Sequence, residues 1–181
     1  VTHDLIIPYL RMWAGPMDYT PGAMLNAQAE TFHANHKEPG SQGTRSHQVA
    51  MYIVYESPLQ MLSDSPTKYE ENTPSFEFIN RIPTTWDETI PLEGKIGEYL
   101  VVARRSGKTW YVGGLNGDEP RELKVKLPPA INDHKSIIIH ADGENAFKEG
   151  KDFRLYDETA DKDGTLTIKM AKGGGFAAII E

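Results

Sequence analysis

Residues 11–22 gather groups that can bind a sugar, since they combine two methionines, two aromatic rings, two prolines and a single acid, Asp18. The carboxylate of Asp18 can accept hydrogen bonds from sugar hydroxyls while the ring of Tyr19 stacks on a sugar face. The same residues also fit a turn in which Asp18 accepts backbone N–H bonds before Pro21, and this structural interpretation is the more common one. Asp18 and Tyr19 are therefore our candidate substrate-binding residues, with the turn as the alternative.

Two other groups of side chains have the types, but not the spacing, of metal ligands. His33, His36 and Glu38 lie in a polar segment, and a zinc site needs a fourth ligand and firmer placement, so a solvated loop is favoured. Three aspartates near Gly164 depart from the calcium-loop spacing, which favours a hairpin turn ending at this glycine: Asp157, Asp161 and Asp163. The sequence predicts no metal site.

Paired acids and a helical histidine complete the candidates for chemistry. Asp87 and Glu88 are adjacent in a predicted strand, so they face opposite sides and cannot act together across one bond. Trp86 beside them is predicted to anchor an interdomain contact. His47 is predicted to be a packed histidine with one hydrogen-bond partner. We therefore assign no catalytic residue.

Composition excludes several classes of protein. The chain has 181 residues and a net charge of −7, whereas a nucleic-acid surface needs a basic excess. It has no cysteine, which rules out disulfides and thiol catalysis. No apolar run approaches the ~18 residues of a membrane span. The chain starts at Val1, almost inside a helical pattern, and we expect it to be a fragment of a longer protein.

The elements that would position these residues change in kind near residue 85. Residues 1–85 are predicted to be helices and loops, with helices at 4–12, from Thr44 to a stop at Pro58, and over 65–77 with Ser65 as N-cap. Residues 86–181 are predicted to be all strand, with a hairpin around residues 106–108. About eight short strands at regular spacing favour an antiparallel sandwich. The glycine triplet 173–175 is either a flexible turn or a place of close backbone packing.

Five segments, in the same order along the chain, resemble the C-terminal part of glycoside hydrolase family 97. They are Gly15-Pro16-Met17-Asp18-Tyr19-Thr20-Pro21, then residues 52–61, then Pro83-Thr84-Thr85-Trp86-Asp87-Glu88-Thr89, then residues 97–105, and finally Trp110-Tyr111-Val112-Gly113-Gly114. The resemblance covers nearly the whole chain. That family contains bacterial α-glucosidases and α-galactosidases.

The resemblance implies an α+β fragment with two parts. Residues 1–85 would be the last strand and helices of a catalytic (β/α)8 barrel, and residues 86–181 a C-terminal β-sandwich in a structural role. The family's paired catalytic carboxylates and its glutamate-bound calcium would lie outside this chain, so the fragment alone would be inactive and hold no cofactor. Asp18 and Tyr19 would sit near the C-terminal ends of the barrel strands, where such active sites lie.

The resemblance also implies partners and a location. The parent protein would bind an oligosaccharide and be periplasmic or otherwise exported, with no nucleic acid or membrane as partner. Residues 1–85 would expose an apolar surface to the missing barrel and N-terminal domain, or to a second copy. The alternative is a noncatalytic carbohydrate-binding sandwich, which would expose Trp110 and Tyr111 as a sugar platform.

Overall fold

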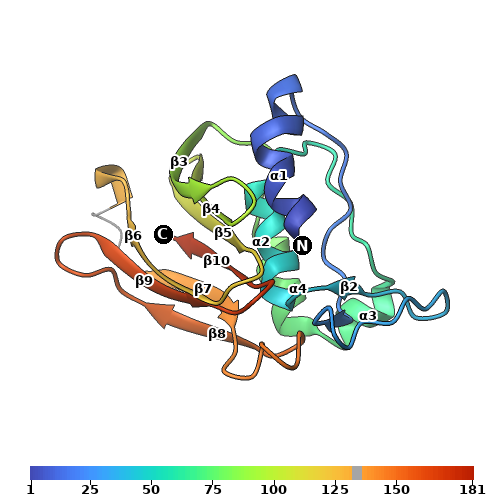
Figure 1. Ribbon diagram of the computed structural model, residues 1–181. Helices are drawn as coiled ribbons and strands as arrows, with labels where there is room; N and C mark the ends of the chain where they lie inside the picture. Colours follow the sequence, from blue (N-terminus) through green and yellow to red (C-terminus); the bar gives the residue numbers. More distant parts are fainter. Residues whose placement is uncertain (132–135) are drawn as a thin grey trace.

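A six-stranded antiparallel sheet forms the centre of the computed structural model, which describes residues 1–131 and 136–181 (Figure 1). The strand order in this sheet is β3-β4-β5-β10-β7-β8, and β6 pairs separately with β9. These eight strands in two sheets confirm the predicted antiparallel sandwich. The bounds are β3 (Glu88–Lys95), β4 (Tyr99–Ser106), β5 (Thr109–Asn116), β6 (Arg121–Lys126), β7 (Ile137–Asp142), β8 (Phe153–Glu158), β9 (Thr165–Met170) and β10 (Gly175–Ile180).

Helices from the first part of the chain cover one face of the large sheet, and the β6–β9 ribbon covers the other (Figure 1). Each interface has its own apolar core. The helical elements are α1 (Thr2–Leu10), the 3₁₀ turns η1 (Arg11–Ala14) and η2 (Pro129–Ile131), α2 (Arg45–Val54), α3 (Pro66–Glu70) and α4 (Thr73–Asn80). None of the helices in the described part has the length and apolar content that a bilayer-spanning helix needs.

Alternating side chains explain the ribbon and its core. Leu123 and Val125 on β6, and Leu166 and Ile168 on β9, point inward and are buried, while Lys124 between them is exposed. The period of two places one side of each strand against the large sheet. The predicted hairpin is also present: Ser106 pairs with Thr109 around a two-residue turn, in which Gly107 takes the left-handed φ of 61° that favours glycine.

Helix α2 is buried on all sides and lies against β5 and β10. Its N-cap is Thr44, whose side chain accepts a hydrogen bond from the backbone N–H of His47, as the sequence predicts. Ser65 likewise caps α3, with Pro66 in the first turn. The single helix expected over 65–77 is wrong, because the chain breaks at residues 71–72 and restarts as α4.

Close backbone packing accounts for the glycine triplet 173–175. A Cβ on Gly175 would lie 2.7 Å from the carbonyl oxygen of Gly114 and 3.0 Å from the Cα of His47. Gly173 takes a left-handed φ of 58°. The triplet therefore joins β9 to β10 where the sheet and the first turn of α2 leave no room for side chains.

Parallel strand pairing is sparse in the first part of the described chain. It consists of the two-residue ladder between β1 (Asn26–Ala27) and β2 (Ser41–Gln42), and an isolated bridge between Tyr19 and Gln60. These pairings do not by themselves form a barrel, so the assignment of residues 1–85 to a barrel stays a prediction. The predicted boundary at residue 85 stays one as well.

Candidate functional site

The two candidate substrate-binding residues point in different directions. Asp18 is exposed, and the described residues include no hydrogen-bond partner for its carboxylate, so the turn-capping alternative gains no support. Tyr19 is half-buried, bridges to Gln60 and packs its ring edge-on against Tyr55 at 4.6 Å between centroids. In an extended segment neighbouring side chains alternate sides. Only Tyr19 therefore faces the interior.

A polar cavity of about 370 Å³ lies beside Tyr19. Hydroxyl, amide and carboxylate groups from five separate segments of the chain meet there. The polar side chains of its lining include Asp4, Tyr19, Ser41, Gln48, Ser63 and Asp64.

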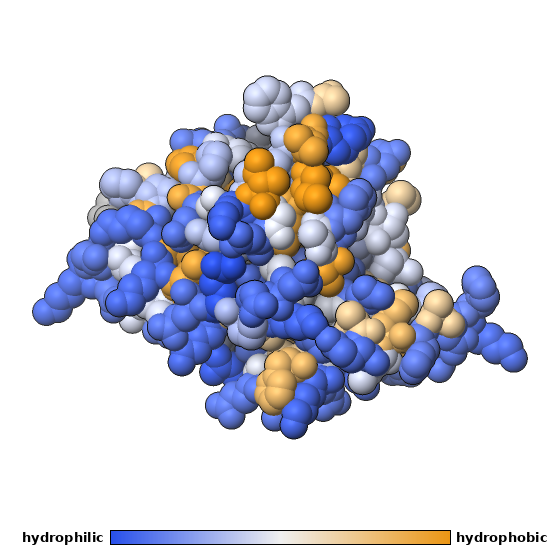
Figure 2. All heavy atoms as spheres, in the orientation of Figure 1, coloured by the Kyte–Doolittle hydropathy of each residue, from blue (hydrophilic) through white to orange (hydrophobic). Residues whose placement is uncertain are grey.

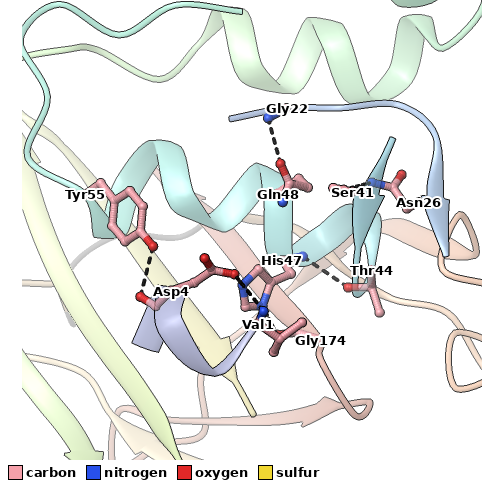
Figure 3. A network of polar contacts seen from close by, with 10 residues as sticks. All are labelled: Val1, Asp4, Gly22, Asn26, Ser41, Thr44, His47, Gln48, Tyr55 and Gly174. Carbon is pink, nitrogen blue, oxygen red and sulfur yellow. Dashed lines mark hydrogen bonds and ion pairs between the residues drawn. The ribbon is translucent and has the colours of Figure 1, made fainter. Parts of the chain in front are cut away.

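Asp4 lines this cavity and contacts His47, which is buried and is not one of the lining residues (Figure 3). The carboxylate Oδ2 of Asp4 lies 3.2 Å from Nε2 of His47, and Nδ1 of His47 lies 2.9 Å from the carbonyl oxygen of Gly174. The hydroxyl of Tyr55 donates to the carbonyl oxygen of Asp4 at 2.9 Å. The prediction of a packed histidine is confirmed, with two partners through its ring rather than one.

The electrostatics of this network favour binding over catalysis. Burial alone would raise the pKa of Asp4, but the hydrogen bond and charge of His47 hold it below its usual range. Burial and the charge of Asp4 raise the pKa of the Tyr19 and Tyr55 hydroxyls, which therefore stay neutral. Asp64 is also engaged, because its Oδ2 accepts the N–H of Met24 at 2.6 Å. The cavity thus offers hydrogen bonds for a polyhydroxylated ligand, and both its carboxylates already have partners.

The histidines of the polar loop do not converge on a metal site. His33 and Glu38 line a second cavity of about 250 Å³ together with Lys151, whereas His36 is exposed and is not among its lining residues. Within residues 1–131 and 136–181, no group of three or more His, Asp or Glu side chains is placed to hold a metal ion.

The three aspartates near Gly164 separate in the structure. Asp157 lies on β8, while Asp161 and Asp163 belong to the turn before β9. Gly164 has a left-handed φ of 77°, and its N–H donates to the carbonyl oxygen of Asp161 at 2.7 Å. The predicted turn is confirmed, but the predicted hairpin is wrong, because β8 and β9 belong to different sheets.

The two acids after Trp86 form ion pairs with one arginine. Asp87 and Glu88 both contact the guanidinium of Arg105, at 3.4 and 3.2 Å, on an exposed part of the surface. Trp86 is half-buried, and its ring lies 5.3 Å from that of Tyr111, between centroids. The prediction that Asp87 and Glu88 face opposite sides is wrong, because Asp87 precedes β3 and both acids reach the same guanidinium. The interdomain contact expected of Trp86 stays a prediction.

The proposed sugar platform is absent from its predicted place. Trp110 is 2% exposed and Tyr111 is 7% exposed, because each ring faces one of the two cores. A stacking platform needs accessible ring faces, so the prediction that these two residues bind sugar is wrong.

A buried polar region at the start of α2 was not predicted from the sequence. The five residues 44–48 are all polar and all buried. Arg45 reaches the side chains of Asn26 and Asn72 and the carbonyl oxygen of Met24. Polar residue types alone predict exposure, and their partners lie far away in the sequence. The capping threonine was the one local indication that a helix starts here.

Comparisons with known proteins cover both parts of the chain. The family described as "Glycosyl-hydrolase 97 C-terminal, oligomerisation" matches residues 85–181. A retaining alpha-galactosidase of Bacteroides thetaiotaomicron is 44% identical over 181 residues, which are all of this chain and 27% of that protein. A probable retaining alpha-galactosidase of Streptomyces bingchenggensis is 28% identical over 98% of this chain and 25% of its own length.

A solved structure of similar fold belongs to the same family as these relatives. It is a glycoside hydrolase family 97 enzyme from Pseudoalteromonas in complex with panose, and it matches with a TM-score of 0.84 and 28% identity. The match covers 99% of this chain and 28% of that one. The chain thus spans about a quarter of the length of these relatives.

Proposed function

The chain belongs to glycoside hydrolase family 97, and from this membership we propose that it is the C-terminal part of an α-glycosidase that hydrolyses α-galactosidic bonds in oligosaccharides. The observation that carries the proposal is the 44% identity to a retaining alpha-galactosidase along the whole chain. An α-glucosidase is the second candidate, because a family enzyme of similar fold has been solved with panose. The parent protein would be exported.

In this proposal the catalytic carboxylates belong to another part of the parent protein. The half-buried acids of the cavity support it, since Asp4 and Asp64 are both engaged by neighbouring groups. Tyr19 would contribute to the wall of the substrate pocket, with Asp18 exposed beside it. Calcium would be bound elsewhere in the parent, because the described residues do not fit a metal site.

The two parts of the chain would then have different roles. Residues 1–85 would complete the catalytic barrel, and residues 86–181 would support it as a structural sandwich. The core between α2 and the large sheet supports the structural role of residues 86–181, because it joins the two parts through one continuous set of buried side chains.

The proposal is tested by assaying the 181-residue chain beside the full-length parent. We expect the parent to hydrolyse p-nitrophenyl α-galactoside and melibiose, and the chain alone to show no turnover. Calorimetric titration of the chain with melibiose and maltose completes the experiment. Turnover by the chain alone would place the catalytic carboxylates within it and refute the proposal. Saturable binding without turnover would favour a sugar-binding module, and hydrolysis of maltose alone by the parent would favour the α-glucosidase.

An exposed apolar surface on residues 1–85 supports docking to the rest of the parent protein. Hydrophobic side chains gather over the end of the molecule formed by α1 (Figure 2). Single exposed leucines are ordinary on a protein surface. Trp13 is 89% exposed and belongs to a part of the chain with several other large exposed apolar side chains, which is unusual. The large exposed apolar residues in this part are Leu10, Trp13, Leu59, Met61 and Leu62.

Removal of this surface should therefore reduce nonspecific apolar binding by the isolated chain. We expect Leu10→Gln/Trp13→Gln to lower the fluorescence of a bound apolar dye about twofold or more and to leave the melting temperature within a few degrees, since both side chains are exposed. Ile96→Gln is the matched control, because Ile96 is 61% exposed at the β3–β4 turn. Equal dye binding by both variants and the unmodified chain would argue against a docking face at α1.

A further inference from the structure

The strand β8 is an open edge of the large sheet. It is the last strand in the order β3-β4-β5-β10-β7-β8 and lies on the outside of the molecule (Figure 1). It pairs with β7 over six residues in unbroken register, from Phe153 opposite Asp142 to Glu158 opposite Ile137. No other strand of the described chain pairs with its far side. An edge of this kind presents a row of unpaired N–H and C=O groups that can bind a further strand.

The opposite edge, β3, is blocked. Pro91 in this strand has no N–H to donate, and the register with β4 shifts between Pro91 and Glu93. A proline and a bulge are two of the devices by which proteins prevent edge-to-edge pairing. Within one sheet, therefore, one edge is protected and the other is left regular and proline-free.

The side chains of β8 alternate between the two faces of the sheet. Tyr156 stands opposite Ile139 and packs against the core beneath the β6–β9 ribbon. Arg154 and Glu158 lie two residues to either side of Tyr156 and so share its face. The guanidinium of Arg154 lies 5.2 Å from the centroid of the Tyr156 ring. Leu155, which is 44% exposed, belongs to the other face.

We propose that β8 binds a second copy of this chain, by antiparallel pairing of the two β8 strands about a twofold axis through Tyr156. An axis of this kind stands perpendicular to the sheet and pairs residues that lie on the same face, so it passes through one residue of the strand. Leu155 and Tyr156 are the two residues at the middle of β8, and each defines one possible register. The first would set Glu158 opposite Asp152 of the second copy, with like charges facing. The second sets Arg154 opposite Glu158 of the second copy, twice, which is why we choose it.

This charge complementarity is what identifies the occupant as a second copy. The sequence of β8 is its own complement about Tyr156, because the cation and the anion stand at equal distances on either side of it. Pairing would extend the six-stranded sheet across both molecules. It agrees with the oligomerisation that the matched family's description names, to which it adds a surface and a register. The inference does not depend on the glycosidase function proposed above.

A charge-swap series tests the register directly. Arg154→Glu and Glu158→Arg should each raise the dissociation constant of the dimer about tenfold, because each sets like charges opposite each other at two places. The double variant Arg154→Glu/Glu158→Arg should recover the affinity of the unmodified chain. An equimolar mixture of the two single variants should form heterodimers, since every cross-strand pair is then complementary. Sedimentation equilibrium, in a Trp13→Gln background that limits association through the α1 face, measures all four.

The control variant is Glu93→Arg on the blocked edge, which should leave the dissociation constant unchanged. Circular dichroism checks that each variant is folded, which we expect because Arg154, Glu158 and Glu93 are all exposed. A chain that is monomeric at high concentration would overturn the proposal. So would a dimer whose affinity does not respond to either single variant, or one that the double variant does not restore.

Discussion

Replacement of Asp142 by asparagine should stabilise the protein at pH 7.5 by up to about 3 kcal/mol. Asp142 ends β7 and is only 4% exposed. Its Oδ2 accepts the N–H groups of Ala171 at 2.8 Å and Gly175 at 3.1 Å, while its Oδ1 has no partner in the described structure. An amide oxygen can accept the same two bonds without a buried negative charge.

The sign follows from the direction of the shift. Burial raises the pKa of Asp142 to about 6, against the opposing effects of the Thr44 hydroxyl, the two backbone N–H groups and the charge of His47. Between the unfolded value of 3.8 and this folded value, the native state binds more protons than the unfolded state. The contribution of Asp142 is therefore fully present below pH 3.8 and lost as the pH rises through 6. Asparagine does not titrate, so its advantage grows as the pH rises across this window and is complete above it.

Denaturant unfolding at several pH values measures the effect. The difference in free energy of unfolding between Asp142→Asn and the unmodified chain should grow from near zero at pH 4 to its full size at pH 7.5. Asp157→Asn, at an exposed carboxylate of β8, is the control and should change little. If the free energy of unfolding changed with pH in the same way for Asp142→Asn and the unmodified chain, burial would not raise the pKa of this carboxylate.

Local patterns account for much of the fold. The alternation of Leu123 and Val125 with lysines predicts β6, and the caps Thr44 and Ser65 predict where helices begin. Such features depend on residues within one or two turns of each other, so a sequence displays them directly. The turn at Gly107 belongs to the same class.

Strand partners could not be predicted in the same way. Strand β10 inserts between β5 and β7, and β6 pairs with β9 some forty residues later. Each of these contacts is set by the packing of whole layers rather than by neighbouring residues. The division of eight strands into six and two follows from this pairing.

The contacts of the candidate site could be predicted from the sequence even less well than the strand partners. Asp18 and Tyr19 are adjacent and chemically suited to one ligand, yet the extended backbone turns them to opposite sides. The buried polar groups that do meet come from segments far apart, as with Asp4 and His47 or His47 and Gly174. Residue type indicates what a side chain can do, whereas its neighbours depend on the fold.

Acidification should destabilise the protein through His140, and His140→Phe should remove this sensitivity. His140 is fully buried between the hydroxyls of Ser46, 3.2 Å from Nδ1, and Ser75, 3.0 Å from Nε2. Its ring stacks on Phe153 with 4.5 Å between centroids, which a phenyl ring can reproduce. At neutral pH the variant leaves two hydroxyls without their partner and should lose about 1–3 kcal/mol.

The effect of low pH on the contribution of His140 to stability is opposite in sign to its effect on the contribution of Asp142. Burial, and next the charge of Arg45 on α2, lower the pKa of His140 to about 3. The unfolded state therefore binds more protons below pH 6.5, and the contribution of His140 is lost progressively as the pH falls from 6.5 toward 3. Between pH 6.5 and pH 4 the unmodified chain should lose about 3 kcal/mol more than His140→Phe does.

The two groups oppose each other in the unmodified chain, so the sharpest test combines their variants. Between pH 4 and pH 6 the gain from protonating Asp142 offsets much of the loss at His140, and the measured stability should be nearly flat from these two groups. Asp142→Asn should expose a steep acid loss, and adding His140→Phe should flatten it again. His36→Gln, at an exposed histidine, is the control and should leave the slope unchanged. An acid slope in Asp142→Asn that persists after His140→Phe would assign the loss to other groups.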